Sequence, residues 1–562
     1  MRQTAGLASA ALALLTRFVA TGKAAQIPFR VDNSWDLNTP PHISATGHLV
    51  FDTVSSLLQQ WPNTRYRNGH SLVPGTVPVG TLLYHGRGDA HLPVGPDWTA
   101  TDPEHSYIFC RGSTEAGCWH LTLVASRPLQ VLYFDGSSAA KMKDGPMDTQ
   151  DVVGWGQVLP DRFFDEKNRI MDLCNWGKPL GVDGFVRMEM DFEIMLCDFT
   201  AGVETVSMAN LALQGHGGPM RRNTSDEDGR ARFSIGFDVL HSGSWHNRYP
   251  GDRRIKLDLT RLISFYDTAL VPSLVETRQG LERWDHRLLG ITAQDVTAVM
   301  DRLAAAYTAP VQAGSGVDWD TLYKVVVDRY ADRFEMVHYI LNVTTADAVP
   351  ATAKKAVAHF RVMLKPYILH TAVPPARRRD NDNAWAAPVF TGCASSHTEF
   401  IRRSAPLFSR LTASEHLLLR AVEETNREIC RTIVRLWTEG VAAGLDDVLP
   451  VDDPAEVDTA ALVQHWRLDM ERLMAWLDWS VWVKCRPECS FEEMCYLPTW
   501  PFGGFRGVRL PGRGDRPSPG GDYPPPGEGY PPPGGPPDSP AQKEDYLRPQ
   551  PRCVRRLEPY NL

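Results

Sequence analysis

The sequence predicts an α+β N-terminal domain, an α-helical C-terminal domain and a disordered tail rich in proline and glycine. Three observations predict this fold class. Short apolar segments separated by turns and short helices continue to about residue 261, which is typical of a mixed, split sheet with short helices. From Leu262 onward the apolar residues recur at helical spacing. Residues 511–540 are dominated by proline and glycine and cannot build a core.

The chain of 562 residues is too long for a single compact core, so we expect two folded domains. The predicted division is a signal peptide over 1–24, an α+β domain over 26–261, a helical domain over 262–502 and a tail over 511–562. A net charge of −8 argues against a nucleic-acid partner, because such partners are bound by basic surfaces.

The N-terminus has the pattern of a secretory leader. Arg2 is followed by an apolar run from Thr4 to Leu15, and Gly22-Lys23-Ala24 offers small residues for cleavage after Ala24. Arg17 makes the run too short to span a membrane, and no later stretch reaches about 18 uninterrupted apolar residues. We therefore expect a secreted, extracellular protein with no membrane span. An ordinary N-terminal helix is the alternative reading.

The ten cysteines agree with secretion, because an even number in an oxidising compartment usually forms disulfides. Cys485, Cys489 and Cys495 lie close in sequence but lack the two-residue spacing and nearby histidines of a zinc site, so no metal is predicted. Asn223 and Asn342 stand in glycosylation tripeptides and predict a glycoprotein if the chain is secreted.

Several short elements are expected in the N-terminal domain. A strand begins at Thr81 and ends at Tyr84, so that His85-Gly86 lies at the rim of a sheet. Asp102 is expected to cap a short helix that begins at Pro103 and contains Tyr107. The segment from Phe185 to Phe199 alternates apolar with polar residues and predicts one long strand. On that strand Arg187, Glu189, Asp191 and Glu193 would share one face.

The C-terminal domain is predicted to contain long helices over 319–341, 351–368 and 459–484. Thr412 and Glu415 form a capping box at the start of another long helix. Cys393 and His397 lie four residues apart, a spacing that suits a metal or a nucleophile pair but is more often structural. The sequence contains no P-loop, no dinucleotide-binding G-x-G-x-x-G after a strand and no G-x-S-x-G elbow.

The candidate site combines Glu193, His85 and Tyr107. A carboxylate beside a sugar can stabilise the oxocarbenium-like charge that develops when a glycosidic bond breaks. A histidine can hydrogen-bond ribose hydroxyls, and a tyrosine ring can stack on a flat base. Together these roles describe cleavage of an N-glycosidic bond such as the nicotinamide–ribose bond.

These residues resemble the His-Tyr-Glu signature of ADP-ribosyltransferases in the diphtheria-toxin and poly(ADP-ribose)-polymerase branch. The resemblance lies in Tyr84-His85-Gly86, in Ser106-Tyr107 and in the segment DFEIMLCD over 191–198, and covers about residues 82–199. It implies NAD as substrate and Glu193 as the catalytic residue. His85 and Gly86 would bind the nucleotide, and Tyr107 would stack on nicotinamide, with Tyr84 or Tyr133 as the alternative stacking ring. The acceptor is an unknown protein, or water.

Two other classes of function remain open from the sequence. A non-enzymatic secreted or cell-surface protein stabilised by disulfides would show the same leader, cysteines and tail. A glycoside hydrolase is a third reading, because paired carboxylates are present, although the sequence does not define their separation. Whether His85 and Glu193 line one pocket distinguishes the NAD-cleaving enzyme from the non-enzymatic protein.

Overall fold

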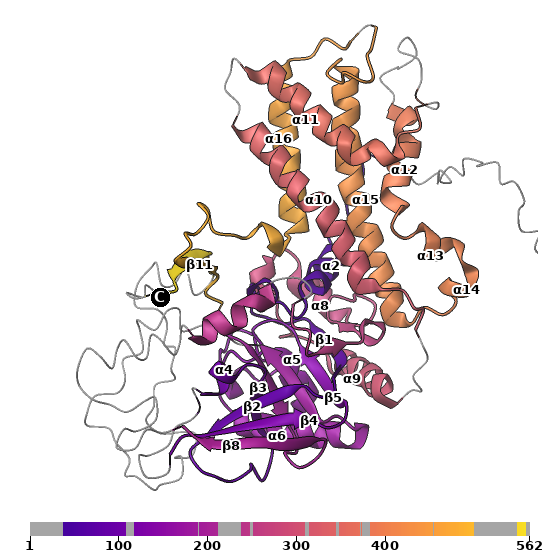
Figure 1. Ribbon diagram of the computed structural model, residues 1–562. Coiled ribbons are helices and arrows are strands. Elements are labelled where there is room, and N and C mark those ends of the chain that lie inside the picture. The colour runs from indigo at the N-terminus through magenta and orange to yellow at the C-terminus, as the bar shows by residue number, and fades with distance from the viewer. Residues whose placement is uncertain are drawn as a thin grey trace, which may run out of the picture.

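The computed structural model describes residues 37–107, 109, 117–188, 190–211, 238–247, 251–308, 314–343, 348–370, 373, 383–452, 454–499 and 548–557. The expected signal peptide over 1–24 lies outside these residues. So does the tail over 511–547. The fold class predicted from the sequence is confirmed: an N-terminal mixed sheet with short helices is followed by a helical region (Figure 1).

The N-terminal domain is built on a ten-stranded sheet. Its strand order is β10-β1-β5-β6-β7-β3-β2-β4-β8, and β9 also pairs with β1. Every neighbouring pair is antiparallel except β5 and β6, which are parallel. The strands are β1 Ser71–Val77, β2 Leu82–Arg87, β3 Asp97–Ala100, β4 Trp119–Ala125, β5 Leu129–Phe134, β6 Gly184–Met188, β7 Phe192–Leu196, β8 Val203–Asn210, β9 Lys256–Leu257 and β10 Ile263–Ser264.

The two faces of the sheet pack into different cores. One face, here called the bundle face, carries residues such as Val131 and Ile194 and shares a continuous core with the long helices. The other, here called the α5/α6 face, carries residues such as Leu132 and Met195 and forms a smaller core. That smaller core is completed by α5 Asp148–Trp155, α6 Glu166–Gly177, α8 Ser273–Arg278 and α9 Ala293–Thr308.

The segment from Phe185 to Phe199 is not one strand. It folds into the hairpin β6–β7, in which Met188 pairs with Phe192 and Arg187 pairs with Glu193. Asp191 supports the turn, because its Oδ1 accepts a hydrogen bond from the backbone N–H of Phe192 at 2.7 Å. The prediction that four charged side chains share one face of a single strand is therefore wrong. Two of them, Arg187 and Glu193, are instead paired across the hairpin.

Three short helices complete the N-terminal domain: α2 Gly47–Ser56, α3 Gln60–Thr64 and α4 Pro103–Tyr107. The helix α4 begins at the proline predicted from the sequence and contacts β2 and β3. Residues 263–308 still pack on the sheet, so the long helices begin at α10, later than the boundary expected at residue 262.

The helical region rises above the sheet in Figure 1. The predicted capping box opens its longest helix, α15, with both reciprocal hydrogen bonds of Thr412 and Glu415 present. Within the described residues, no helix combines the length and the apolar character that a membrane crossing needs. The helices are α10 Trp319–Asn342, α11 Val349–Leu364, α12 Ala387–Ser395, α13 Glu399–Arg403, α14 Ala405–Phe408, α15 Ala413–Ala442 and α16 Thr459–Leu477.

The C-terminal residues fold back on the body of the protein. The strand β12 Arg552–Arg555 pairs with β11 Glu493–Tyr496, and a disulfide joins Cys553 to Cys489. The prediction of a disordered tail over 511–562 is therefore wrong for residues 548–557. Further disulfides join Cys174 to Cys197, Cys393 to Cys430 and Cys485 to Cys495.

Candidate active site

Glu193 lies on the α5/α6 face in a row of directly paired residues. Tyr84 pairs with Ala100, Ala100 with Glu193, and Glu193 with Arg187. Side chains paired in this way across antiparallel strands point to the same face of a sheet. Gly86 lies two residues beyond Tyr84 in β2, and Trp98 two residues before Ala100 in β3, so both belong to this face as well. We call Tyr84, Gly86, Trp98, Arg187 and Glu193 the Glu193 face.

His85 lies on the opposite face, because successive residues of a strand point to opposite sides. Its ring lies 5.4 Å from that of Phe199, which belongs to the core of the bundle face. Its Nδ1 donates a hydrogen bond to the carbonyl oxygen of Trp98 at 2.6 Å. The prediction that His85 and Glu193 point into one cleft is therefore wrong. The strand β2 continues to Arg87 instead of ending at Tyr84, and this fixes the alternation of the side chains.

Tyr107 is the last residue of α4 and is half-buried. The helix lies against the α5/α6 face, because Oγ of Ser106 is 2.9 Å from Nε2 of His120, a residue paired directly with Gly86. The structure thus brings Gly86 and the helix that carries Tyr107 to the face of Glu193. It shows no contact between Tyr107 and Glu193 themselves.

Glu193 is held in a buried chain of alternating charges. Nε of Arg187 donates to Oε1 of Glu193, and Nη2 of Arg187 donates to Glu166 on α6. Glu166 also pairs with Arg169 at 2.8 Å, and Arg169 pairs with Asp151 at 3.0 Å. Glu193 is 2% exposed. The hydrogen bond from Arg187 engages Oε1 of Glu193.

Two carboxyl groups in this row of charges, Glu166 and Asp151, have pKa values shifted in opposite directions. Burial disfavours the charged form of Glu166, but Arg187, Lys141 and Arg169 outweigh it and lower the pKa of Glu166 to about 2. Burial raises the pKa of Asp151 to about 6, although Arg169 opposes the shift. Glu166 is therefore ionised over the physiological range and keeps Arg187 in position beside Glu193.

His105 adds an unpartnered ring to the same region. It lies on α4, is 1% exposed, and neither ring nitrogen has a hydrogen-bond partner. Burial lowers the pKa of His105, and Glu193 is the carboxylate that opposes this shift most strongly. A buried neutral imidazole without a partner is costly and is typical of a site that acquires a ligand. Sequence reasoning treated His105 only as part of a short helix.

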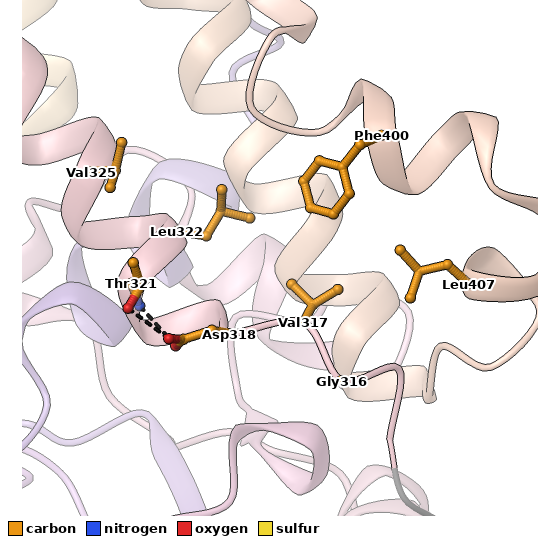
Figure 2. A pocket seen from close by; sticks show the side chains of 8 residues that line it. All are labelled: Gly316, Val317, Asp318, Thr321, Leu322, Val325, Phe400 and Leu407. Atoms are coloured by element: carbon orange, nitrogen blue, oxygen red, sulfur yellow. Dashed lines mark hydrogen bonds between the residues drawn. The ribbon is translucent and has the colours of Figure 1, made fainter. Parts of the chain in front are cut away.

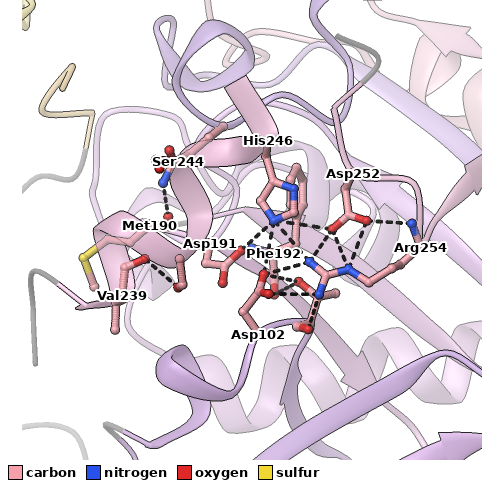
Figure 3. Close-up of polar contacts among 12 residues, drawn as sticks. Asp102, Met190, Asp191, Phe192, Val239, Ser244, His246, Asp252 and Arg254 are labelled. Atoms are coloured by element: carbon pink, nitrogen blue, oxygen red, sulfur yellow. Dashed lines mark hydrogen bonds and ion pairs between the residues drawn. The ribbon is translucent and has the colours of Figure 1, made fainter. Parts of the chain in front are cut away.

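A second polar cluster connects Asp191, next to β7, with Asp102, which directly precedes α4 (Figure 3). The ring of His246, in the short helix Ser244–Asn247, lies within 3.5 Å of three carboxylates. Nε2 of His246 is 3.2 Å from Asp102, 3.3 Å from Asp191 and 3.5 Å from Asp252. Arg254 completes the cluster by pairing with Asp102 at 2.7 Å and with Asp252 at 2.9 Å. We call these five residues the Asp102 cluster.

Burial and proximity shift the pKa values in the Asp102 cluster. Burial raises the pKa of Asp191 to about 7, and the neighbouring Asp102 carboxylate adds to the shift. Burial opposes protonation of His246, but hydrogen bonds to Asp102 and Asp191 outweigh it and raise the pKa of His246 to about 9. The expectation that Asp191 is a simple neighbour of Glu193 on one strand therefore missed its contacts with residues far along the chain.

A polar cavity of about 20 Å³ lies where the sheet meets the helical region. Asp52, His70, Asp135 and Arg283 are among the residues that line it. NH1 of Arg283 pairs with Asp52 at 2.7 Å, and burial raises the pKa of Asp135 to about 7. This volume holds about one water molecule. The cavity is therefore a small polar space lined by residues of the N-terminal domain and has no room for a nucleotide.

A larger hollow of about 340 Å³ lies beside the start of α10 (Figure 2). Its lining is mostly apolar, and Asp318 is committed to capping the helix through hydrogen bonds with Thr321. It offers no acid, base or nucleophile. Cys393 likewise carries no chemistry with His397, because it is bonded to Cys430. The apolar lining residues are Val317, Leu322, Val325, Phe400 and Leu407.

Comparison with known proteins shows likeness to two proteins of Saccharomyces cerevisiae strain ATCC 204508 / S288c. Residues 43–119 and 118–230 match the family described as the YPL277C N-terminal domain. The chain is 24% identical to uncharacterized protein YOR389W over 80% of this chain and 81% of that protein. It is 26% identical to uncharacterized protein YPL277C over 54% of this chain and 78% of that protein. No solved structure matches the chain. The matched segments contain the whole Glu193 face.

Proposed function

We propose that the N-terminal domain cleaves the nicotinamide–ribose bond of NAD at the Glu193 face, by transfer to an acceptor or to water. The observation that supports the proposal best is the sharing of one sheet face by Glu193, Gly86 and Trp98. Glu193 supplies a carboxylate for the ribose. Gly86 lets the carboxamide approach the backbone, and Trp98 offers a flat ring that can stack on nicotinamide.

Glu193 is the catalytic residue in this proposal. Departure of nicotinamide leaves positive charge on the ribose ring, and a fixed carboxylate stabilises that charge. Arg187 holds Oε1 of Glu193 and thereby fixes the carboxylate in place. The chain of charges through Glu166 fixes Arg187 in turn. Glu193 itself is buried, so a substrate reaches it only after neighbouring side chains move.

The roles of the other residues differ from those that the resemblance implies. His85 is a positioning residue, because it faces away from Glu193 and binds the backbone of β3 through the carbonyl of Trp98. His105 takes its place beside the carboxylate, where a neutral imidazole can donate to a ribose hydroxyl. Tyr107 and Trp98 are the two candidate rings for stacking on nicotinamide.

We also propose that the protein is secreted. The four described disulfides support this, since such bonds persist in oxidising compartments. Cys118 is disulfide-bonded too, and the described residues include no free cysteine. Cys485 and Cys495 are bonded to each other, which leaves no thiolate there for a metal.

The experiment uses purified, fully oxidised full-length protein. NAD binding is measured by calorimetry, and nicotinamide release is followed by chromatography with and without a mixture of secreted proteins as acceptors. We expect micromolar to millimolar binding and a nicotinamide release that exceeds the spontaneous rate. If neither binding nor release is seen, the proposal fails and the non-enzymatic reading replaces it.

A further inference from the structure

We infer that Asp102, Asp191 and His246 form a binding site for one divalent transition-metal cation, with Zn²⁺ and Mn²⁺ as the best-matched ions. The inference is independent of NAD cleavage, because none of the three residues belongs to the Glu193 face. It starts from the Asp102 cluster, in which one ligand atom from each residue lies within 4.8 Å of the others. Figure 3 shows the two carboxylates and the imidazole directed toward one another.

The spacing of the donor atoms matches that of ligands around one cation. Nε2 of His246 is 3.2 Å from Oδ2 of Asp102 and 3.3 Å from Oδ1 of Asp191. Two donors bound to one Zn²⁺ at about 2.1 Å are roughly 3.0–3.4 Å apart in octahedral or tetrahedral geometry. His246 therefore already stands at the separation that a cation imposes from each of the two carboxylates, and all three donors lie within 4.8 Å of one another.

A separate observation comes from Asp191, which is completely buried. Its Oδ1 accepts from the backbone of Phe192, but its Oδ2 has no hydrogen-bond partner. A buried carboxylate oxygen without a donor costs several kcal/mol, so such atoms usually bind a proton, a water or an ion. The Asp191 carboxylate belongs to the cluster together with that of Asp102, so a cation bound there would contact both groups.

The charges of the cluster also favour a divalent cation. Asp102, Asp191 and Asp252 supply three negative charges, and Arg254 supplies one positive charge. Histidine binds metals as the neutral imidazole, so a metal that binds here displaces the proton that His246 shares with the carboxylates. Once that proton has left, two negative charges remain. One divalent cation neutralises them. Imidazole and carboxylate together favour Zn²⁺ or Mn²⁺ over Ca²⁺, which prefers oxygen ligands alone.

Arg254 is the competing cation, and its position allows it to yield. Its side chain is 26% exposed, whereas those of Asp191 and His246 are fully buried. It binds Asp252 as well as Asp102, so it can keep the pair with Asp252 when a cation takes Asp102. The Asp102 side chain is 14% exposed and offers the route of entry from solvent.

The test is metal binding by the oxidised full-length protein after treatment with a chelator and dialysis. ZnCl₂ and MnCl₂ are titrated separately at pH 7.5 and followed by calorimetry, without NAD. We expect one ion per chain and a rise in the melting temperature. Asp191→Asn and Asp102→Asn should each weaken binding at least tenfold, because each removes the charge of a ligand while keeping its shape.

The matched control is His465→Gln. His465 is exposed and lies 3.2 Å from Asp469 and 3.8 Å from Glu439, so it represents adventitious surface binding. Binding that survives His465→Gln and is lost in the aspartate variants supports the inference. Absence of binding, or loss only in His465→Gln, overturns it in favour of an ion-pair network completed by Arg254. If Asp191→Asn does not fold by circular dichroism, Asp102→Asn decides. Nicotinamide release plays no part in either outcome.

Discussion

His85 donates a hydrogen bond from Nδ1 to the carbonyl oxygen of Trp98 across 2.6 Å and thereby fastens β2 to β3 from the face opposite to Glu193. The histidine of the sequence motif is thus separated from the carboxylate by the sheet itself. Its contribution is to fix the position of Trp98, whose ring lies on the Glu193 face.

Replacing His85 should affect stability more than chemistry. His85→Ala removes a buried hydrogen bond and leaves the Trp98 carbonyl without its donor, at a cost of about 1–3 kcal/mol in the free energy of unfolding. The rate of nicotinamide release at saturating NAD should stay within about tenfold of the wild-type rate. A loss of that rate as large as the loss in a Glu193 variant would contradict the placement of His85.

Gly86 tests where the nucleotide binds. Gly86→Ala adds a methyl group to the Glu193 face, at a residue of β2 whose φ does not require glycine. If the ligand approaches the backbone there, NAD affinity should fall at least fivefold while the melting temperature changes little. Gly80→Ala, at an open turn with a positive φ, is the contrasting control, which should lower stability and leave affinity unchanged.

The chain of charges behind Glu193 predicts an acid-dependent loss of stability. The folded protein lowers the pKa of Glu166 from 4.5 to about 2. A depressed pKa stabilises the folded state above pH 4.5, and this contribution disappears as the pH falls toward 2. It amounts to about 3 kcal/mol. Denaturant unfolding of Glu166→Gln should therefore show lower stability at pH 7 and a shallower slope between pH 4.5 and 2. An unchanged slope would mean that Glu166 is not charged in the folded state.

The secretion proposal predicts few reactive thiols. The natural protein, denatured without reductant, should release almost no thiol to a titrating reagent, because its described cysteines are bonded. Its N-terminus should lie near Ala25, and mass spectrometry of the secreted fraction measures both properties. Recovery of a chain that begins at Met1 with most cysteines titratable would place the protein in a reducing compartment.

Local signals in the sequence predicted the elements that local interactions form. The capping box at Thr412 and Glu415 placed the start of α15, and Pro103 placed the start of α4. The hairpin within 185–199 was missed because the sequence between Met188 and Phe192 contains no glycine or proline and continues the alternation of the strands. Only the pairing of Arg187 with Glu193 reveals the turn.

The sites depend on contacts that sequence spacing does not show. His246 meets Asp102 from 144 residues away, and Glu166 on helix α6 reaches Arg187 on strand β6. The face on which His85 lies was mispredicted because it depends on how far β2 extends. An end at Tyr84 would have freed the ring to turn toward Glu193, whereas a strand that continues to Arg87 fixes it on the other side.

The most direct test of the account is the single-turnover rate of nicotinamide release by Glu193→Gln at saturating NAD. The amide keeps the shape of the side chain but loses the charge that stabilises an oxocarbenium-like state. The account predicts a rate at least about 100-fold below wild type with NAD affinity within a few fold, and a normal rate for Glu204→Gln, an exposed carboxylate on β8. A Glu193→Gln rate equal to that of wild type would contradict the assignment of Glu193 as the catalytic residue.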